Sequence, residues 1–251
     1  MAQSAEEAGT SEQQQPQPQQ QQPEQQPHQR QQNNLADGRF GSRRLLLFVT
    51  VLVIELTIFF LAMAIPMDAT QQKSLYTEGQ QIVQSVKGQG PLDEFSGIFL
   101  NNVRIALIEA VPFVGPVFLG YSLFYSGEVV QALAVLSPTP VPPLILGAVL
   151  FLLPHSLVEF TGYAVSVTAG VMLIWAGIKK RLRIEIRVYA KEVLVAVGVL
   201  LVAAATETSL DVYPDLAFAL WVPIIIGIVV IWVWLRRAHT RQGQVAPTVP
   251  L

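Results

Sequence analysis

Residues 45–65 read LLLFVTVLVIELTIFFLAMAI, an apolar run with a single charged residue, Glu55, near its middle. A helix of this length can cross the hydrocarbon core of a bilayer, which takes about 20 residues. Further apolar stretches follow it along the chain. We therefore predict an integral membrane protein with several crossings.

The composition agrees with that class, because 51% of the residues are hydrophobic and only 14% are charged. The sequence contains no cysteine, which excludes disulfides, thiolate metal sites and thiol nucleophiles. The formal net charge of −2 gives no support to nucleic-acid binding. We expect a protein that contacts the lipid bilayer and no nucleic acid.

The apolar stretches predict an all-α fold, a polytopic transmembrane helical bundle over residues 44–238 with about six crossings. A short apolar segment, residues 144–153, is too short to span the membrane and precedes Pro154. We expect a re-entrant or broken half-helix there. The expected crossings are residues 45–65, 98–120, 121–136, 157–178, 193–206 and 217–235.

The segments between and beyond these crossings differ in charge. Residues 1–43 are rich in Gln and Pro and predict a disordered tail. Basic residues gather before the first crossing, in an expected loop at 179–191, and after the last crossing. The positive-inside rule then predicts cytoplasmic termini, including a C-terminal tail at 239–251, and an extracytoplasmic loop at 66–96. We expect a multi-pass protein of the plasma membrane.

Two polar residues four apart, His155 and Glu159, share one face of the helix that follows Pro154. One interpretation is local: Ser156 and Glu159 have the spacing of a capping box. The same face continues through three small residues, which favour close approach of another helix: Gly162, Ser166 and Gly170. Two potential ligands are too few for zinc, so we expect no metal, no cofactor and no catalytic residue.

A second polar stripe lies on the helix that begins near Ile98 and carries Asn101, Asn102, Arg104 and Glu109. Asparagine amides both donate and accept hydrogen bonds, so we expect a polar cluster within the bundle. Its members would be Asn101, Asn102, Arg104, Glu109, His155, Ser156 and Glu159. Arg104 either pairs with Glu109 across helices or extends to the membrane surface. For Glu55 we leave open an interhelical hydrogen bond and a proton-handling role.

Two motifs, the run from Ile98 to Ala106 and the run from Leu153 to Glu159 followed by Gly162 and Gly170, carry a resemblance. Together they resemble the stage II sporulation protein M family of integral membrane proteins. The resemblance implies a membrane protein that acts within a complex, as members in spore-forming bacteria recruit cell-wall-degrading proteins.

We therefore expect a membrane scaffold or assembly protein rather than an enzyme, with protein partners or self-association in the membrane. The alternative is a small-solute or ion/proton transporter that uses Glu55, His155 and Glu159. The alternative lacks an evident inverted repeat in the sequence, a feature of many transporters.

Overall fold

The computed structural model describes residues 27–86 and 90–226, and these contain helices and no strand. The all-α prediction is therefore confirmed for this part of the chain. By its internal contacts the chain divides into residues 1–42 and 43–251, and the packing below concerns the second unit. The helices are α1 (Pro27–Ala64), α2 (Ala69–Val86), α3 (Pro91–Glu109), α4 (Val114–Leu136), α5 (Pro143–Phe151), α6 (Pro154–Ile178) and α7 (Leu182–Val212), followed by the 3₁₀ helix η1 (Pro214–Leu216).

Four helical stretches are long and apolar enough to cross a bilayer: Arg43–Ala64, Val114–Leu136, Pro154–Ile178 and Leu182–Val212. The expected count of about six crossings is not confirmed. Helix α3 has a suitable length of 19 residues, but it carries Asp93, Glu94 and Arg104. The last expected crossing, 217–235, extends beyond the described residues.

The boundary expected at Gly120 is wrong, because α3 ends at Glu109 and α4 begins at Val114. The sequence around Pro112 forces the turn. Phe113 has a φ of 66°, in the left-handed region that side chains other than glycine disfavour. A Cβ atom at Gly115 would lie 1.7 Å from the carbonyl oxygen of Glu109, so this tight turn requires glycine.

The segments expected as loops outside the membrane, residues 66–96 and 179–191, are largely helical. The first contains α2 and the start of α3, because the apolar face of α2 packs on α4: a Cβ at Gly79 would lie 3.0 Å from Val129. Within residues 179–191, α7 already begins at Leu182. Glu185 and Tyr189 lie one turn apart on this helix and contact Arg44 and Ala110, which favours the early start.

The expected disordered tail, residues 1–43, overlaps with α1, which begins at Pro27. Pro27 is the last proline before residue 66, and proline suits the first turn of a helix. Residues 1–26 and the expected C-terminal tail, 239–251, lie outside the described residues.

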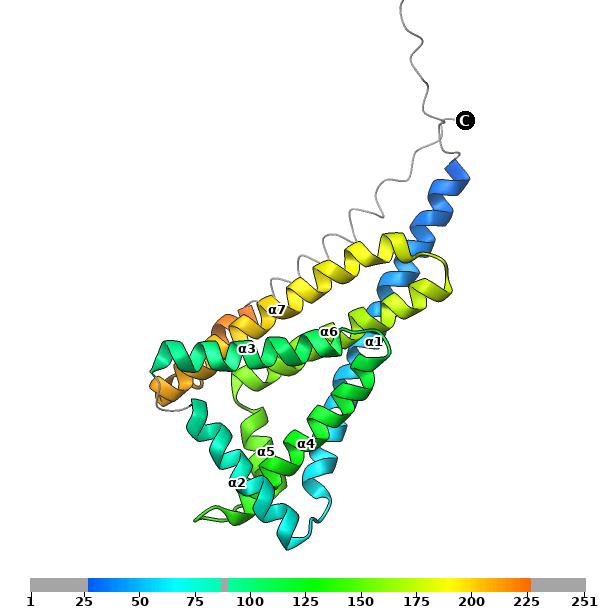
Figure 1. Ribbon diagram of the computed structural model, residues 1–251. Coiled ribbons are helices and arrows are strands. Elements are labelled where there is room, and N and C mark those ends of the chain that lie inside the picture. Colours follow the sequence, from blue (N-terminus) through cyan, green and yellow to red (C-terminus); the bar gives the residue numbers. More distant parts are fainter. Residues whose placement is uncertain (1–26, 87–89, 227–251) are drawn as a thin grey trace, which may run out of the picture. The chain divides into compact units, whose positions relative to one another are not determined.

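Helices α3, α6 and α7 lie side by side, and α6 contacts both of the others (Figure 1). The contacts are close because small residues line them. A Cβ at Gly170 would lie 2.7 Å from the carbonyl oxygen of Ala110, just after α3. A Cβ at Gly162 would lie 2.8 Å from the side chain of Leu200 in α7. Close backbone approach is the usual way for helices to gain contact energy in lipid, where no hydrophobic effect draws them together.

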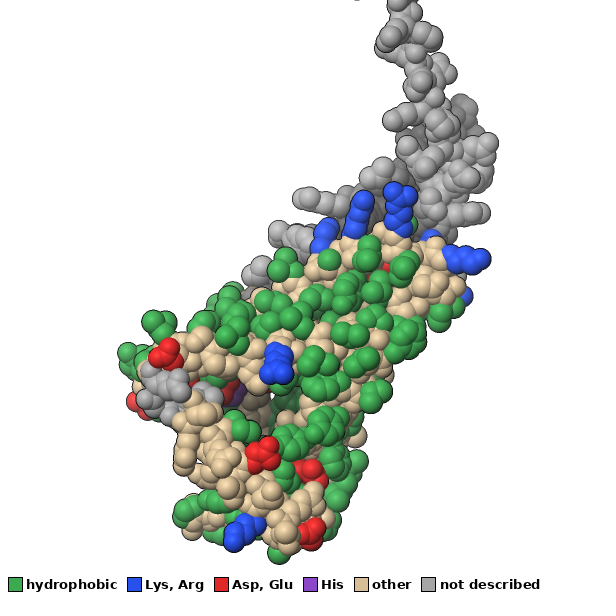
Figure 2. Space-filling model, viewed as in Figure 1, with side chains coloured by type: hydrophobic (Ala, Val, Ile, Leu, Met, Phe, Trp, Pro, Cys, Tyr) green, Lys and Arg blue, Asp and Glu red, His purple; other side chains and the backbone are tan. Residues whose placement is uncertain are grey.

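Helices α1, α5 and α6 meet through aromatic side chains. The ring of Phe59 stands edge-on to Phe160 at 5.6 Å, and Phe151 stands edge-on to Phe160 at 5.8 Å. Helix α4 joins this group through Gly127, where a Cβ would lie 2.6 Å from the carbonyl oxygen of Phe59. On the face shown in Figure 2, basic side chains gather over the start of α7 and hydrophobic side chains cover much of the remainder.

The packing predicts opposite outcomes for alanine at two glycines. Gly170→Ala should lower the free energy of unfolding by about 1 to 3 kcal/mol, because its methyl group meets a backbone carbonyl that cannot move aside. Gly198→Ala in α7 is the matched control: beyond its own stretch of helix, no atom of the described residues lies within 4 Å of its Cβ position, and alanine favours helix by about 1 kcal/mol. Thermal melting in mild detergent measures both. Equal melting of the two variants would contradict the close contact.

Candidate functional site

The chain breaks between α5 and α6, at Leu152 and Leu153, in front of Pro154. Pro154 occupies the first turn of α6, where its missing N–H leaves no hydrogen bond unmade. The hydroxyl of Ser156 donates to the carbonyl oxygen of Leu150 at 2.8 Å, which satisfies an acceptor near the end of α5. The side chain of Ser156 thus ties α6 to the nine-residue helix α5 across the break.

The capping box expected from Ser156 and Glu159 is wrong. The N-cap of α6 is Leu153 and has no side-chain cap. Because the N-cap is Leu153, three residues before the position that the motif requires, Ser156 already lies inside the first turn. Glu159 instead accepts a hydrogen bond of 2.7 Å from the hydroxyl of Tyr163, one turn further along α6.

The expected hydrogen-bonded cluster between α3 and α6 does not form among the described residues. Asn102 is buried, but its side-chain oxygen accepts a hydrogen bond of 3.4 Å from the neighbouring amide of Asn101 rather than from α6. Both helices run in the same direction (Figure 1), and Ala110 abuts Gly170. Asn102 lies about 12 Å before Ala110 and His155 about 22 Å before Gly170, so they are about 10 Å apart along the bundle.

His155 is half-buried, and it interacts electrostatically with Asp211 at the end of α7. Its Nδ1 has no hydrogen-bond partner in the part of the chain that the structure describes. Arg104, which we considered as a partner of Glu109, is exposed. Arg104 therefore agrees with the alternative in which its side chain extends outward, whereas His155 interacts with α7 rather than with the asparagines of α3.

The structure brings together three acidic residues from three helices, which we call the acidic core: Glu55 of α1, Glu109 of α3 and Glu159 of α6. Glu55 and Glu109 are fully buried, and Glu159 is half-buried. Glu55 interacts electrostatically with Glu109, and Glu109 with Glu159. Sequence reasoning placed Glu109 and Glu159 in one polar cluster, but it did not pair Glu55 with Glu109.

Hydroxyl groups accompany two members of the acidic core. Ser122 of α4 donates to Oε1 of Glu109 at 3.4 Å, and Tyr163 donates to Glu159. Glu55 differs, because neither of its oxygens has a hydrogen-bond partner within the described ranges. A buried carboxyl without a partner is costly, and such residues in membrane proteins usually serve a function.

A network that sequence reasoning missed ties α1 to α7. Arg44 forms ion pairs with Glu185 and Glu192, which are two helical turns apart on one face of α7. Arg43 places its guanidinium 4.7 Å from the centre of the Trp175 ring in α6. The seven-residue spacing of two acids within an otherwise basic segment is the signal that could have revealed this network.

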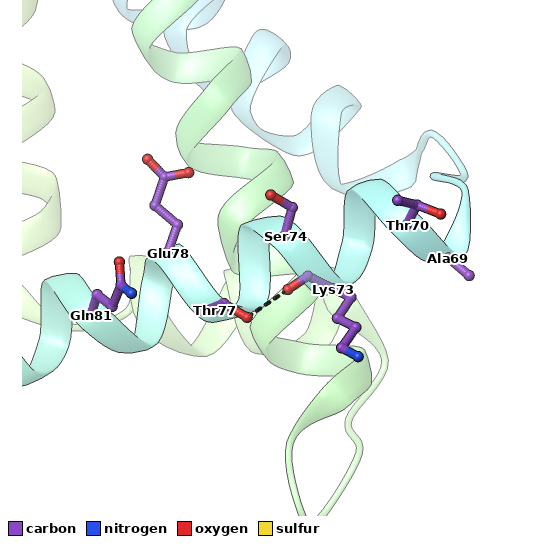
Figure 3. A pocket seen from close by; sticks show the side chains of 7 residues that line it. All are labelled: Ala69, Thr70, Lys73, Ser74, Thr77, Glu78 and Gln81. Atoms are coloured by element: carbon purple, nitrogen blue, oxygen red, sulfur yellow. Dashed lines mark hydrogen bonds between the residues drawn. The ribbon is translucent and has the colours of Figure 1, made fainter.

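A groove runs along α2, and Figure 3 shows the side chains that line it along one side of that helix. They include both charges, Lys73 and Glu78, and several hydroxyl and amide groups. The opposite face of α2 is fixed on α4, where Gln71 also donates to Glu128 at 2.9 Å. The lining residues are Ala69, Thr70, Lys73, Ser74, Thr77, Glu78 and Gln81.

The described residues contain no group of three or more His, Cys, Asp or Glu side chains that could hold a metal ion. Within the acidic core, Glu109 interacts electrostatically with both Glu55 and Glu159. Such an arrangement can carry protons or hydrogen bonds from one helix to the next.

The Arg44 network predicts a large effect of removing one cation. Arg44→Met should lower the free energy of unfolding by about 3 kcal/mol, because it leaves buried Glu185 without its partner. Adding Glu185→Met should restore much of the loss, since no unpaired buried charge then remains at that position. Arg181→Met, at an exposed residue before α7, is the control. If Arg44→Met melts like Arg181→Met in detergent, the ion pairs do not stabilise the bundle.

Comparison with known proteins places the chain in a family. The family model for stage II sporulation protein M matches residues 44–210, which include α2 to α6 and most of the described parts of α1 and α7. A search of curated proteins found no match, and a search of solved structures found none either. The match covers well over half of the sequence and its helices are those of a membrane protein. The chain belongs to the stage II sporulation protein M family.

Proposed function

We propose that this protein is a non-enzymatic scaffold of the plasma membrane that binds partner proteins through α2. Family membership and the apolar helices support a membrane protein of this kind. The resemblance in its motifs adds the expectation of a role within a membrane complex. In the described residues, the segments between candidate spans consist of α2, α3, α5 and short turns.

The groove along α2 is the observation that favours partner binding. Its lining side chains are exposed, and they combine one cation, one anion and several hydrogen-bonding groups. A polar segment of a partner protein suits such a surface, because both charges and hydrogen bonds would be matched. The contacts of Gly79 and Gln71 with α4 hold the helix in place, so binding would order few new groups.

Filling the groove tests this role. Thr77→Trp should lower the amount of partner subunits that co-purify in mild detergent about tenfold, which corresponds to about 1.4 kcal/mol of binding free energy. Gln84→Trp is the matched control, because Gln84 is exposed on the same helix and does not line the groove. Unchanged co-purification with Thr77→Trp, at unchanged melting temperature, would rule out the groove as the docking site.

The proposed orientation has both termini and the turn before α7 in the cytoplasm, with α2 on the other side. It requires α3 to cross the membrane together with the candidate spans in α1, α4 and α6, because an even number of crossings must separate the N-terminus from that turn. Basic residues before α1's apolar part and around Lys179 support it. The sequence has no cysteine, so single cysteines can be placed without background labelling. Gln84→Cys should react with an impermeant maleimide on intact cells, and Lys179→Cys should react only after permeabilisation. The reverse pattern would overturn the orientation.

A second candidate is an ion or proton transporter, for which Glu55, His155 and Glu159 are the residues of interest. One observation favours it: Glu55 is fully buried and neither of its oxygens is hydrogen-bonded within the described part of the chain. A scaffold alone gives no reason to retain such a group.

A further inference from the structure

The acidic core contains a group that structural stability does not explain. Glu55 is fully buried, and its two oxygens find no hydrogen-bond donor among the described residues. Oε2 of Glu109, its electrostatic neighbour on α3, also has none. A carboxylate in these surroundings would be both desolvated and next to another carboxylate, so binding a proton relieves both costs.

We propose that Glu55, Glu109 and Glu159 form a proton-binding path that opens near the end of α7 and terminates at Glu55. This inference goes beyond the scaffold role and does not depend on it. The ligand is the proton, supplied by water at the open end.

The path follows a series of neighbouring groups from the surface inward. At the open end Asp211 is exposed, and Glu207 and His155 are half-buried. Glu207 interacts electrostatically with Tyr163, and Asp211 with His155. Tyr163 then donates to Glu159 at 2.7 Å, which links the half-buried acid to the buried interior.

The inner half of the path connects four helices. Glu159 and Tyr163 of α6 both interact electrostatically with Glu109 of α3. Glu109 accepts the hydrogen bond of Ser122 from α4 and interacts with Glu55 of α1. The groups at the open end are thus exposed or half-buried, whereas Glu109 and Glu55 at the inner end are both fully buried.

No redox step is involved. At the open end a hydronium ion gives its proton to a carboxylate, which yields a carboxylic acid and a water molecule. Each later step moves one proton between oxygens, so that one carboxyl becomes a carboxylate as its neighbour becomes a carboxyl. The hydroxyls of Tyr163 and Ser122 can pass a proton on, because each both donates and accepts hydrogen bonds.

Difference infrared spectroscopy of the full-length protein in lipid nanodiscs tests the proposal over a pH titration. The carbonyl band of protonated carboxyl groups should appear reversibly as the pH falls. Glu55→Gln, Glu109→Gln and Glu159→Gln should each remove one contribution to that band, because glutamine has the same shape but cannot bind the proton. Glu78→Gln, at an exposed acid of α2, should leave the contribution of the buried groups unchanged.

A second variant tests the path itself and also serves if a glutamine variant fails to fold. Tyr163→Phe retains the ring but removes the hydroxyl between Glu159 and its neighbours, so proton uptake after a rapid pH drop should slow about tenfold or more. The proposal is overturned if the buried band is absent or does not change with pH in the wild type. It is also overturned if the band is unaffected by all three glutamine variants, or if Tyr163→Phe takes up protons at the wild-type rate. None of these results bears on partner binding at α2, which the groove variant tests separately.

Discussion

The contact between the backbone of α6 at Gly170 and the carbonyl group of Ala110 is the constraint on which the interior of this protein depends. It fixes the register of α3 against α6, because a residue larger than glycine would push the two helices apart. Glu109 directly precedes Ala110, so the same contact brings its carboxyl group into the bundle, where it meets the groups of α1, α4 and α6. In the low-dielectric interior of a protein, such groups interact strongly with one another.

The charged groups at the start of α7 and those in the interior of the bundle are arranged differently. At the start of α7, charges are paired: Arg44 joins α1 to two acids of α7, and Arg43 lies over Trp175. In the interior, acids face acids, and the supporting groups are hydroxyls. The first arrangement pairs opposite charges, whereas the second places buried acids near one another. Costly ionisable residues inside membrane proteins are usually retained for function.

Much of the architecture could be predicted from hydropathy: the helical class, the break before Pro154 and the small residues that let α6 approach its neighbours. The predictions that failed did so for different physical reasons. Helix α2 is polar on one face and owes its place to contacts with α4 at Gly79, which local sequence does not reveal. The capping box failed because Pro154 began the helix earlier. The predicted polar cluster does not form because Asn102 and His155 lie at different positions along the bundle axis. The pairing of Glu55 with Glu109 depends on the register between helices, which spacing along the chain does not reveal.

Packing of α3 on α6 brings Glu109 near Glu55 of α1, with which it interacts electrostatically. A double-mutant cycle on thermal unfolding, with Glu55→Gln, Glu109→Gln and the double variant, measures this proximity most directly. The account predicts a coupling free energy above about 0.5 kcal/mol for this pair and additive effects for Glu55→Gln with Glu78→Gln, since distant sites do not couple. Additive effects of Glu55→Gln and Glu109→Gln would contradict it.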